Sequence, residues 1–171
     1  LLKNVFINFK KEKKAIIFAY EVNDPQRYGV IEFDSDSNVI SIEEKPENPK
    51  SSFAAVGLYY YNNDVIQIAK NLSPSLRGEL EITDINLRFL SQNRLKVQIL
   101  NSIFWLDTGT HDSLVEASNF IKTVESRDGR KISCLEEIAY KYGYINKEKL
   151  QNIIETYSNE YGDYLRQLIN D

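Results

Sequence analysis

The stretch Trp105-Leu106-Asp107-Thr108-Gly109-Thr110-His111-Asp112-Ser113-Leu114 decides the fold. It follows an apolar, strand-like run over residues 95–100 and 104–106, and it leads into a segment with helical periodicity. Asp107 is therefore expected at a strand-to-helix corner. Such corners carry ligand sites in α/β proteins, although an aspartate there can also fix the loop through local hydrogen bonds.

The segment after this corner is expected to form one long helix. Thr110 is a suitable N-cap, and Gly129 fits just past the helix end. The apolar face consists of residues at helical spacing, namely Leu114, Ala117, Ile121 and Val124. Asp107-Thr108-Gly109 is also the triplet that carries the catalytic acid of aspartic proteases. Those proteins are built almost wholly from strands, so a helix directly after the triplet argues against that alternative.

The part of the chain before this stretch mixes strand and helix patterns. Apolar and β-branched runs predict strands, and two of them flank a turn-rich segment and predict a hairpin; the runs are 15–22, 28–34, 38–44 and 53–61. Helices are expected after a cap at Asn62 or Asn63 and over Gly78–Asn93. Glu79, Glu81 and Asp84 lie near the start of the second helix and are interpreted as complements to its dipole.

The tail after Gly129 is predicted to be helical. Ser133–Glu136 is expected to form a capping box before a short helix, and Asn146 is expected to start another. No linker separates this tail from the rest. We therefore expect residues 1–129 to form the main domain and residues 130–171 to form a helical extension packed on the same domain.

Composition narrows the function classes. The 171 residues carry a formal charge of -4 with a pI near 5.2, which argues against a nucleic-acid-binding protein. No apolar run approaches the roughly 18 residues of a membrane span. A single cysteine, Cys134, excludes an internal disulfide, is expected to be an inert thiol and weakly favours a cytoplasmic location. The chain contains no methionine, so we expect a fragment.

Glu43-Glu44-Lys45-Pro46 combines acids with a base, and such a set can hold sugar hydroxyls and a phosphate. The alternative is a charged strand end in solvent. Strict strand alternation places Glu44 and Lys45 on opposite faces, so both reach one ligand only if the strand bends.

Other candidate positions are glycines and an arginine. Gly29 and Gly57 are expected where a ligand approaches the main chain, although either can be a bulge or a turn. Arg77 precedes a predicted helix and can face an anion. The sequence has no P-loop, no glycine-rich nucleotide motif and no nucleophile triad.

Taken in order, six segments resemble the glucose-1-phosphate thymidylyltransferases, a sugar nucleotidyltransferase family. They are Asp24-Pro25, Tyr28-Gly29-Val30 with Glu32-Phe33-Asp34, Glu43-Glu44-Lys45-Pro46, Val56-Gly57-Leu58-Tyr59, Arg77-Gly78-Glu79-Leu80-Glu81-Ile82-Thr83-Asp84 and Trp105-Leu106-Asp107-Thr108-Gly109-Thr110. The match covers nearly all of this chain and corresponds to the second half of the family, without its nucleotide-binding half.

The resemblance implies an α/β fold, part of a mixed Rossmann-like sheet with flanking helices and a C-terminal helical extension. It implies the Mg2+-dependent reaction of dTTP with glucose 1-phosphate to give dTDP-glucose and pyrophosphate, a step of nucleotide-sugar biosynthesis such as the dTDP-rhamnose pathway. A cytoplasmic homotetramer is implied as well. The fragment alone is expected to be inactive, and the rival reading is a non-catalytic sugar-phosphate-binding or assembly module.

Residue roles follow from the same resemblance. Asp107 matches a metal-binding aspartate, Lys45 and Arg77 match basic residues on the sugar phosphate, and Glu44 matches the carboxylate that accepts sugar hydroxyl hydrogen bonds. Backbone contacts and pocket walls match Gly29, Ala55, Gly57, Tyr28, Tyr59 and Trp105. A regulatory nucleotide site matches Glu137, Ile138 and Lys141, but the family usually has an arginine at the last position. Losing its planar fork of donors weakens nucleotide binding there.

Overall fold

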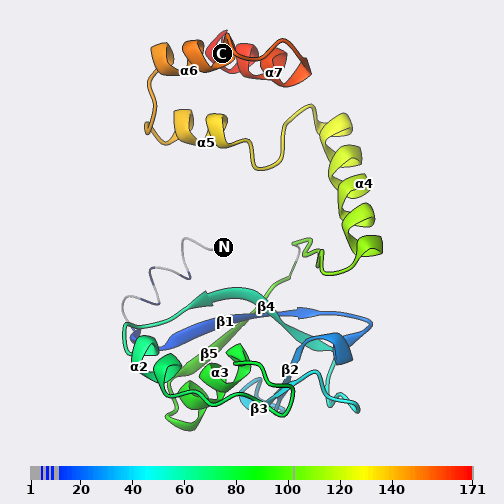
Figure 1. Cartoon of the computed structure of the whole chain (residues 1–171), viewed down its shortest axis with the longest axis vertical. Coiled ribbons are helices and arrows are strands. Elements are labelled where there is room, and N and C mark those ends of the chain that lie inside the picture. Colours follow the sequence, from blue (N-terminus) through cyan, green and yellow to red (C-terminus); the bar gives the residue numbers. More distant parts are fainter. Residues whose placement is uncertain (1–4, 6, 8, 10–11, 102, 171) are drawn as a thin grey trace. The chain divides into compact units, whose positions relative to one another are not determined.

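A five-stranded sheet with the order β3-β2-β4-β1-β5 forms the first of two units of the chain (Figure 1). The computed structural model describes residues 5, 7, 9, 12–101 and 103–170. The units span Leu1–Trp105 and Leu106–Asp171, and each is described by itself. The strands are β1 (Ala15–Glu21), β2 (Gly29–Phe33), β3 (Val39–Glu44), β4 (Phe53–Tyr60) and β5 (Leu95–Ile99).

The sheet is mixed. β1 pairs antiparallel with β4 and parallel with β5, and β2 and β3 form the expected antiparallel hairpin. β2 meets β4 at Val30 and Ala54. A short 3-10 helix, η1 (Pro25–Arg27), connects β1 to β2. The mixed α/β fold expected from the sequence is confirmed.

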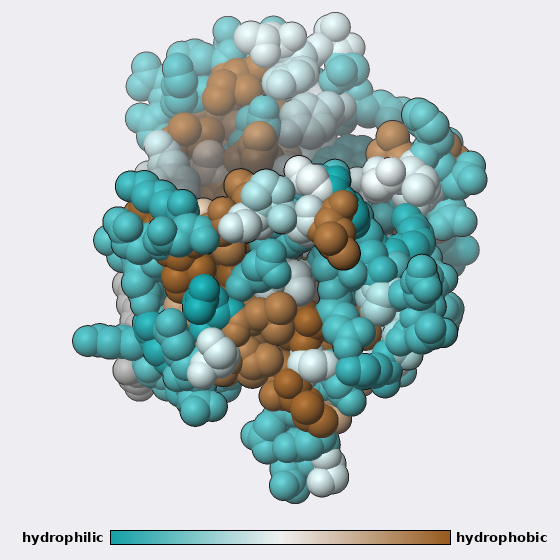
Figure 2. Space-filling view, turned by 60° about the horizontal axis from the view of Figure 1, so that its bottom comes forward, coloured by the Kyte–Doolittle hydropathy of each residue, from teal (hydrophilic) through white to brown (hydrophobic). Residues whose placement is uncertain are grey.

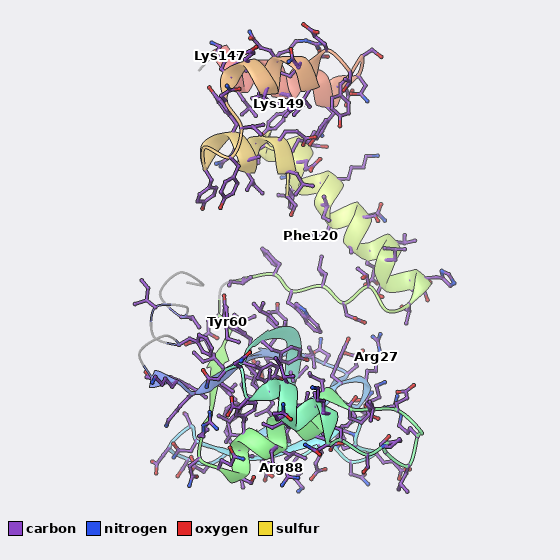
Figure 3. All side chains as sticks on the ribbon, turned by 60° about the vertical axis from the view of Figure 1, so that its left-hand side comes forward. Arg27, Tyr60, Arg88, Phe120, Lys147 and Lys149 are labelled. Carbon is purple, nitrogen blue, oxygen red and sulfur yellow. The ribbon has the colours of Figure 1, made fainter. Side chains whose placement is uncertain are left out.

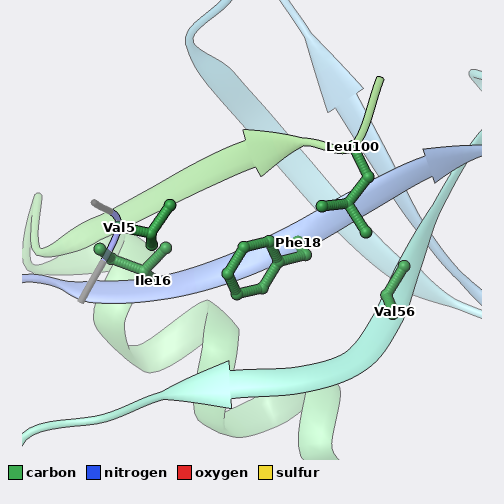
Figure 4. Packing of buried hydrophobic residues seen from close by; sticks show 5 residues of the cluster. All are labelled: Val5, Ile16, Phe18, Val56 and Leu100. Atoms are coloured by element: carbon green, nitrogen blue, oxygen red, sulfur yellow. The ribbon is translucent and has the colours of Figure 1, made fainter. Parts of the chain in front are cut away.

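Both faces of β1 are buried, because its side chains alternate between two apolar clusters. One face carries Ile16 and Phe18, which pack with residues from β4, from beyond β5 and from the N-terminal segment (Figure 4). The buried members of this cluster are Val5, Ile16, Phe18, Val56 and Leu100. On the opposite face, Ile17 and Ala19 pack with Ile31 and Ile42 of the hairpin.

Two helices, α2 (Val65–Lys70) and α3 (Ile82–Ser91), lie on one face of the sheet (Figure 1). Phe89 and Ile85 of α3 pack against Ala15 of β1, and apolar residues of α2 close this cluster. Several other large apolar side chains remain exposed, and hydrophobic patches stand between hydrophilic areas on the face in Figure 2.

The expected start of α2 was wrong. Its N-cap is Asp64, and the Asn62 amide instead donates a hydrogen bond of 2.5 Å to the Lys13 carbonyl. The expected start of α3 at Gly78 was also wrong. Gly78 has a φ of 77° and closes a turn in which its N–H donates to the Ser75 carbonyl at 2.9 Å, so the helix begins at Ile82.

The corner after β5 is longer than the sequence suggests. β5 ends at Ile99, and residues 104–106 do not form the expected strand. α4 (His111–Asp128) begins where expected, because the Thr110 hydroxyl accepts the Ser113 N–H, and it ends at Gly129 with a φ of 69°. Of its expected apolar face, Ala117 is buried, whereas Leu114 is 50% exposed.

Three further helices complete the second unit: α5 (Leu135–Lys141), α6 (Lys147–Ile154) and α7 (Glu160–Asn170). Their core contains Cys134, Leu150, Ile154, Tyr164 and Leu165. Asn146 caps α6 as predicted, accepting the Lys149 N–H at 2.8 Å, and the side chains of Lys147 and Lys149 project from this helix (Figure 3).

The predicted capping box at Ser133 was wrong. Cys134 is the N-cap of α5 and makes no side-chain cap hydrogen bond, and Ser133 has a φ of 56°. The physical reason is that Glu136, which was expected to reach back to the cap, accepts hydrogen bonds from Tyr157 and Tyr161 instead.

No helix in the described part of the chain is long and apolar enough to cross a membrane. The expected division at residue 129, and the packing of residues 130–171 on the first domain, stay predictions.

Candidate functional site

Five residues meet where β2 begins and β3 ends, beside α3. Gly29, Glu44, Ala55, Arg77 and Thr83, here called the Glu44 cluster, come from three strands, the loop before α3 and the first turn of α3. Gly29 pairs with Glu44 across the hairpin, and α3 packs on β3, which brings the buried Thr83 over this pair. The fold therefore collects four residues that the sequence predicted separately, and it adds Thr83.

Gly29 is needed for this arrangement. A Cβ at this position would lie 3.1 Å from Thr83 Oγ1, 3.3 Å from Glu44 Oε2 and 3.7 Å from Ala55 Cβ. A larger residue would push the carboxylate and the hydroxyl out of place. The close neighbours of Gly29 in the structure are thus side chains of the protein itself, and the predicted approach of a ligand to its main chain stays a prediction.

The Glu44 carboxylate is held at both oxygens. Oε2 accepts a hydrogen bond of 2.6 Å from the Thr83 hydroxyl, and Oε1 lies 3.8 Å from Arg77 Nη1. The preceding residue, Glu43, pairs at 2.5 Å with Lys50, and this contact raises the pKa of that ammonium. Glu44 is consequently fixed as an acceptor beside a guanidinium.

The backbone of Lys45 shows how Glu44 and Lys45 can reach one ligand although strict strand alternation places them on opposite faces. β3 ends at Glu44, and Lys45 has a φ of 44°, in the left-handed region that residues with a Cβ rarely adopt. Its N–H donates to the Tyr28 carbonyl at 2.9 Å, which holds the bend against β2. Because the chain bends here, alternation no longer forces the exposed Lys45 side chain to the face opposite Glu44.

A tight turn presents Arg77. The Arg77 N–H donates to Ser75 Oγ at 3.2 Å, and the Ser75 N–H donates to the Glu79 carbonyl at 2.8 Å. Glu79 and Glu81 therefore precede α3 and face Arg77, at 2.6 and 3.6 Å from its guanidinium. Because the helix starts later than expected, Glu79 lies outside its first turn, whereas Glu81 is the N-cap residue and remains at the positive end of the helix. Asp84 does lie in the first turn of α3.

An aromatic group lies at the same hairpin end. Trp105 packs against Tyr28 edge-on, with ring centroids 5.4 Å apart, and against Tyr20 at 5.8 Å. The Arg27 guanidinium lies 5.3 Å from the centre of the Tyr28 ring, and Arg27 is labelled in Figure 3. Tyr28 and Trp105 thus come together, and their role as walls of a sugar pocket stays a prediction.

Tyr59 lies within electrostatic reach of Glu44. Burial raises the pKa of the Tyr59 hydroxyl, and the negative charge of Glu44 raises it further. The Tyr59 ring stacks on Tyr61 at 5.6 Å, and the Tyr61 hydroxyl donates to buried Asn86 at 2.6 Å. Gly57 differs from Gly29, since no described atom lies within 4 Å of a Cβ built there. Its predicted close approach to a ligand stays a prediction.

Asp107 belongs to the second unit and is described within it. A Cβ added to Gly109 would lie 3.1 Å from Asp107 Oδ2, so the carboxylate occupies the space beside this glycine. The described residues contain no group of three or more His, Cys, Asp or Glu side chains suited to a metal. Mg2+ is usually held through one or two carboxylates together with phosphate oxygens and water. A single aspartate fits that donor set.

The predicted regulatory residues lie on α5. Glu137 accepts hydrogen bonds from Lys141 Nζ and from the Tyr164 hydroxyl of α7, both at 2.5 Å. These two contacts lower the pKa of the Glu137 carboxyl. Ile138 is 42% exposed. Glu137 thus links α5 to α7, and a regulatory role stays a prediction.

A second carboxylate on α5, that of Glu136, lies close to Cys134. Glu136 accepts a short hydrogen bond from the Tyr161 hydroxyl, which lies 3.1 Å from Cys134 Sγ. The Tyr161 contact lowers the pKa of Glu136, and burial raises the pKa of Tyr161. Glu136 lies only two residues after Cys134, but Tyr161, which contacts both, comes from a helix 27 residues further along and could not be placed there from the sequence.

Comparisons with known proteins agree on one family. The model of the nucleotidyl transferase family matches residues 2–124. A glucose-1-phosphate thymidylyltransferase of Neisseria meningitidis is 50% identical over 157 residues, which are 91% of this chain and 54% of the relative. One from Mycobacterium tuberculosis is 47% identical over 163 residues, 94% of this chain and 57% of the relative. This chain thus spans about half the length of the curated relatives it matches.

Two solved structures with similar folds also carry the names of sugar nucleotidyltransferases. A Bacillus anthracis protein, a proposed glucose-1-phosphate thymidylyltransferase crystallised with sucrose, matches with a TM-score of 0.63 and 40% identity, over 70% of this chain and 48% of that one. A UDP-glucose pyrophosphorylase in complex with UDP-glucose matches with a TM-score of 0.60 and 27% identity, over 71% of this chain and 49% of that one.

Proposed function

This chain belongs to the nucleotidyl transferase family, and from that premise we propose that it is the sugar-phosphate-binding part of a glucose-1-phosphate thymidylyltransferase. The observation that carries the proposal is the Glu44 cluster. A fixed carboxylate can accept hydrogen bonds from sugar hydroxyls, and a guanidinium beside it can bind a phosphate.

In the proposed reaction, a phosphate oxygen of glucose 1-phosphate attacks the α-phosphorus of dTTP in line. The bond from the α-phosphorus to the oxygen that bridges the α and β phosphates breaks. Pyrophosphate is the leaving group, and dTDP-glucose is the second product. No protein nucleophile takes part, so positioning and charge supply most of the catalysis. This agrees with the lack of a nucleophile triad in the sequence.

Each residue of the site has a role in this proposal. Glu44 accepts hydrogen bonds from the glucose hydroxyls, and Thr83 keeps its carboxylate in one orientation. Arg77 and Lys45 bind the sugar phosphate as cations. The backbone of Gly29, Ala55 and Gly57 contacts the sugar, and the aromatic rings of Tyr28, Tyr59 and Trp105 wall the pocket.

The proposed reaction needs Mg2+, and Asp107 is the residue of this chain that would hold it. The ion would neutralise phosphate charge.

We propose that activity belongs to a longer protein that contains this chain, and that the chain alone does not turn over. dTTP, glucose 1-phosphate and dTDP-glucose are the proposed ligands. A cytoplasmic homotetramer is the proposed state, by likeness to the family.

The test is pyrophosphate release from dTTP and glucose 1-phosphate by the full-length protein. Arg77→Ala is expected to raise the KM for glucose 1-phosphate at least tenfold, because an ionic contact to phosphate is lost. Asp107→Ala is expected to abolish Mg2+-dependent turnover and to leave the circular dichroism spectrum intact. Arg88→Ala is the matched control, because Arg88 projects from α3 into solvent (Figure 3).

Unchanged kinetics in both Arg77→Ala and Asp107→Ala would refute the assignment. Binding of glucose 1-phosphate without any turnover in the full-length protein would favour the non-catalytic module.

A further inference from the structure

Three carboxylates face the Arg77 guanidinium. Glu79 Oε2 lies 2.6 Å from Nη2, whereas Glu81 Oε1 and Glu44 Oε1 lie 3.6 and 3.8 Å from Nη1. One cation is therefore surrounded by three anions. A phosphate that approaches Arg77 meets a region of net negative charge.

The three acids are held in different ways. Glu44 accepts the Thr83 hydroxyl at 2.6 Å, and Glu81 accepts the Ser75 hydroxyl at 2.8 Å. Their side chains are 22% and 11% exposed, whereas that of Glu79 is 62% exposed. Glu44 and Glu81 are consequently fixed by neutral donors, and Glu79 is the acid that can leave into water at little cost.

The turn explains why Glu79 reaches Arg77. The two residues flank Gly78, whose φ of 77° and N–H bond to the Ser75 carbonyl bring their side chains to the same side. Glu79 also makes the shortest contact with this guanidinium among the described residues. An arginine recognises phosphate best with two parallel N–H donors, and Glu79 occupies one of the nitrogens that such a pair requires.

We propose that Glu79 is a built-in competitor for the sugar phosphate: it occupies Arg77 in the empty site, and the phosphate displaces it. A phosphate dianion outcompetes a single carboxylate for the guanidinium, whereas a neutral sugar does not compete for Arg77. Glu79 therefore lowers the affinity for glucose 1-phosphate and leaves the affinity for free glucose unchanged. This inference rests on the proposed function and adds a residue that sets the affinity for the sugar phosphate.

The experiment is calorimetric titration of the 171-residue chain with glucose 1-phosphate and, separately, with glucose. Glu79→Gln keeps the size of the side chain and removes its charge. It is expected to lower the Kd for glucose 1-phosphate about fivefold, the upper range for an exposed ion pair. Glu79→Ala should behave alike. Glu12→Gln is the matched control, since Glu12 pairs at 3.1 Å with an unrelated base, Lys96.

Equal Kd values for wild type and Glu79→Gln would overturn the inference and leave the proposed function standing. Weaker binding by Glu79→Gln would also overturn it, because Glu79 would then support Arg77. A lower Kd for glucose 1-phosphate in the Glu12→Gln control would show that the gain in affinity comes from the change in net charge and not from Arg77. That result would overturn the inference too. If neither wild type nor variant binds glucose 1-phosphate, both the inference and the proposed function fall.

Discussion

Tyr161→Phe is expected to destabilise the helices of the second unit. The substitution removes one hydroxyl, which donates to the Glu136 carboxylate and contacts Cys134 Sγ at 3.1 Å. Glu136 then keeps a weak hydrogen bond from Tyr157 at 3.4 Å. Hydrogen bonds to charged groups contribute about 1.5–3 kcal/mol, so we expect the free energy of unfolding to fall by about 2 kcal/mol.

The loss depends on pH in a defined direction. The Tyr161 hydrogen bond lowers the pKa of Glu136 below its ordinary 4.5, so its stabilisation is present above that value and is lost as pH falls through the lowered pKa. The pKa of Tyr161 is raised above its ordinary 10.0, so the hydroxyl stays protonated at neutral pH. The difference between wild type and variant is therefore expected in full at pH 7 and should shrink below pH 4.5.

Urea unfolding followed by far-ultraviolet circular dichroism measures this difference. With a slope of about 1 kcal/mol/M, a loss of 2 kcal/mol moves the midpoint by about 2 M. Tyr142→Phe is the control, because Tyr142 is 75% exposed and should change stability by less than about 0.5 kcal/mol. Equal midpoints for Tyr161→Phe and wild type, or a difference that grows in acid, would refute the reasoning.

Three further substitutions test the packing. Phe18→Ala truncates a side chain that is 0% exposed and should lower the free energy of unfolding, measured in urea, by about 3–5 kcal/mol; a loss under about 1 kcal/mol would contradict the core assignment. Gly29→Ala adds a Cβ 3.1 Å from Thr83 Oγ1 and should cost about 1–3 kcal/mol by the same assay and weaken glucose 1-phosphate binding. Unchanged stability and affinity would show that Thr83 and Glu44 move aside freely. Gly129→Ala forces a φ of 69° on alanine and should cost about 1–2 kcal/mol, seen as faster amide exchange at the end of α4; unchanged exchange would argue against this C-cap.

Local patterns predicted the regular elements well. The β-branched runs around β1 and the hairpin, the cap at Thr110 and the left-handed Gly129 were all read correctly, because each depends on neighbours within a few residues. The start of α3 was missed, since Gly78 closes a turn that delays the helix.

Contacts between distant segments were not predictable. Thr83 meets Glu44 across 39 residues, and Tyr161 meets Glu136 across 25. Neither pair has a periodic signal in the sequence. The resemblance to a family supplied Arg77 and Glu44 as candidates, but the roles of Ser75 and Glu79 depend on the turn before α3. The left-handed Lys45 was equally hidden, because its neighbour Pro46 favours an extended residue but does not fix the sign of φ.

The central claim is that this chain binds a sugar phosphate at the Glu44 cluster. Titration of the isotope-labelled chain with glucose 1-phosphate, followed by amide resonances, tests it most directly. The account predicts saturable shifts that centre on Gly29, Glu44 and Ala55 and that disappear in Arg77→Ala. Shifts confined to other regions, such as the groove between α4 and α7 lined by Lys122 and Glu160, would contradict it, as would no shifts at all.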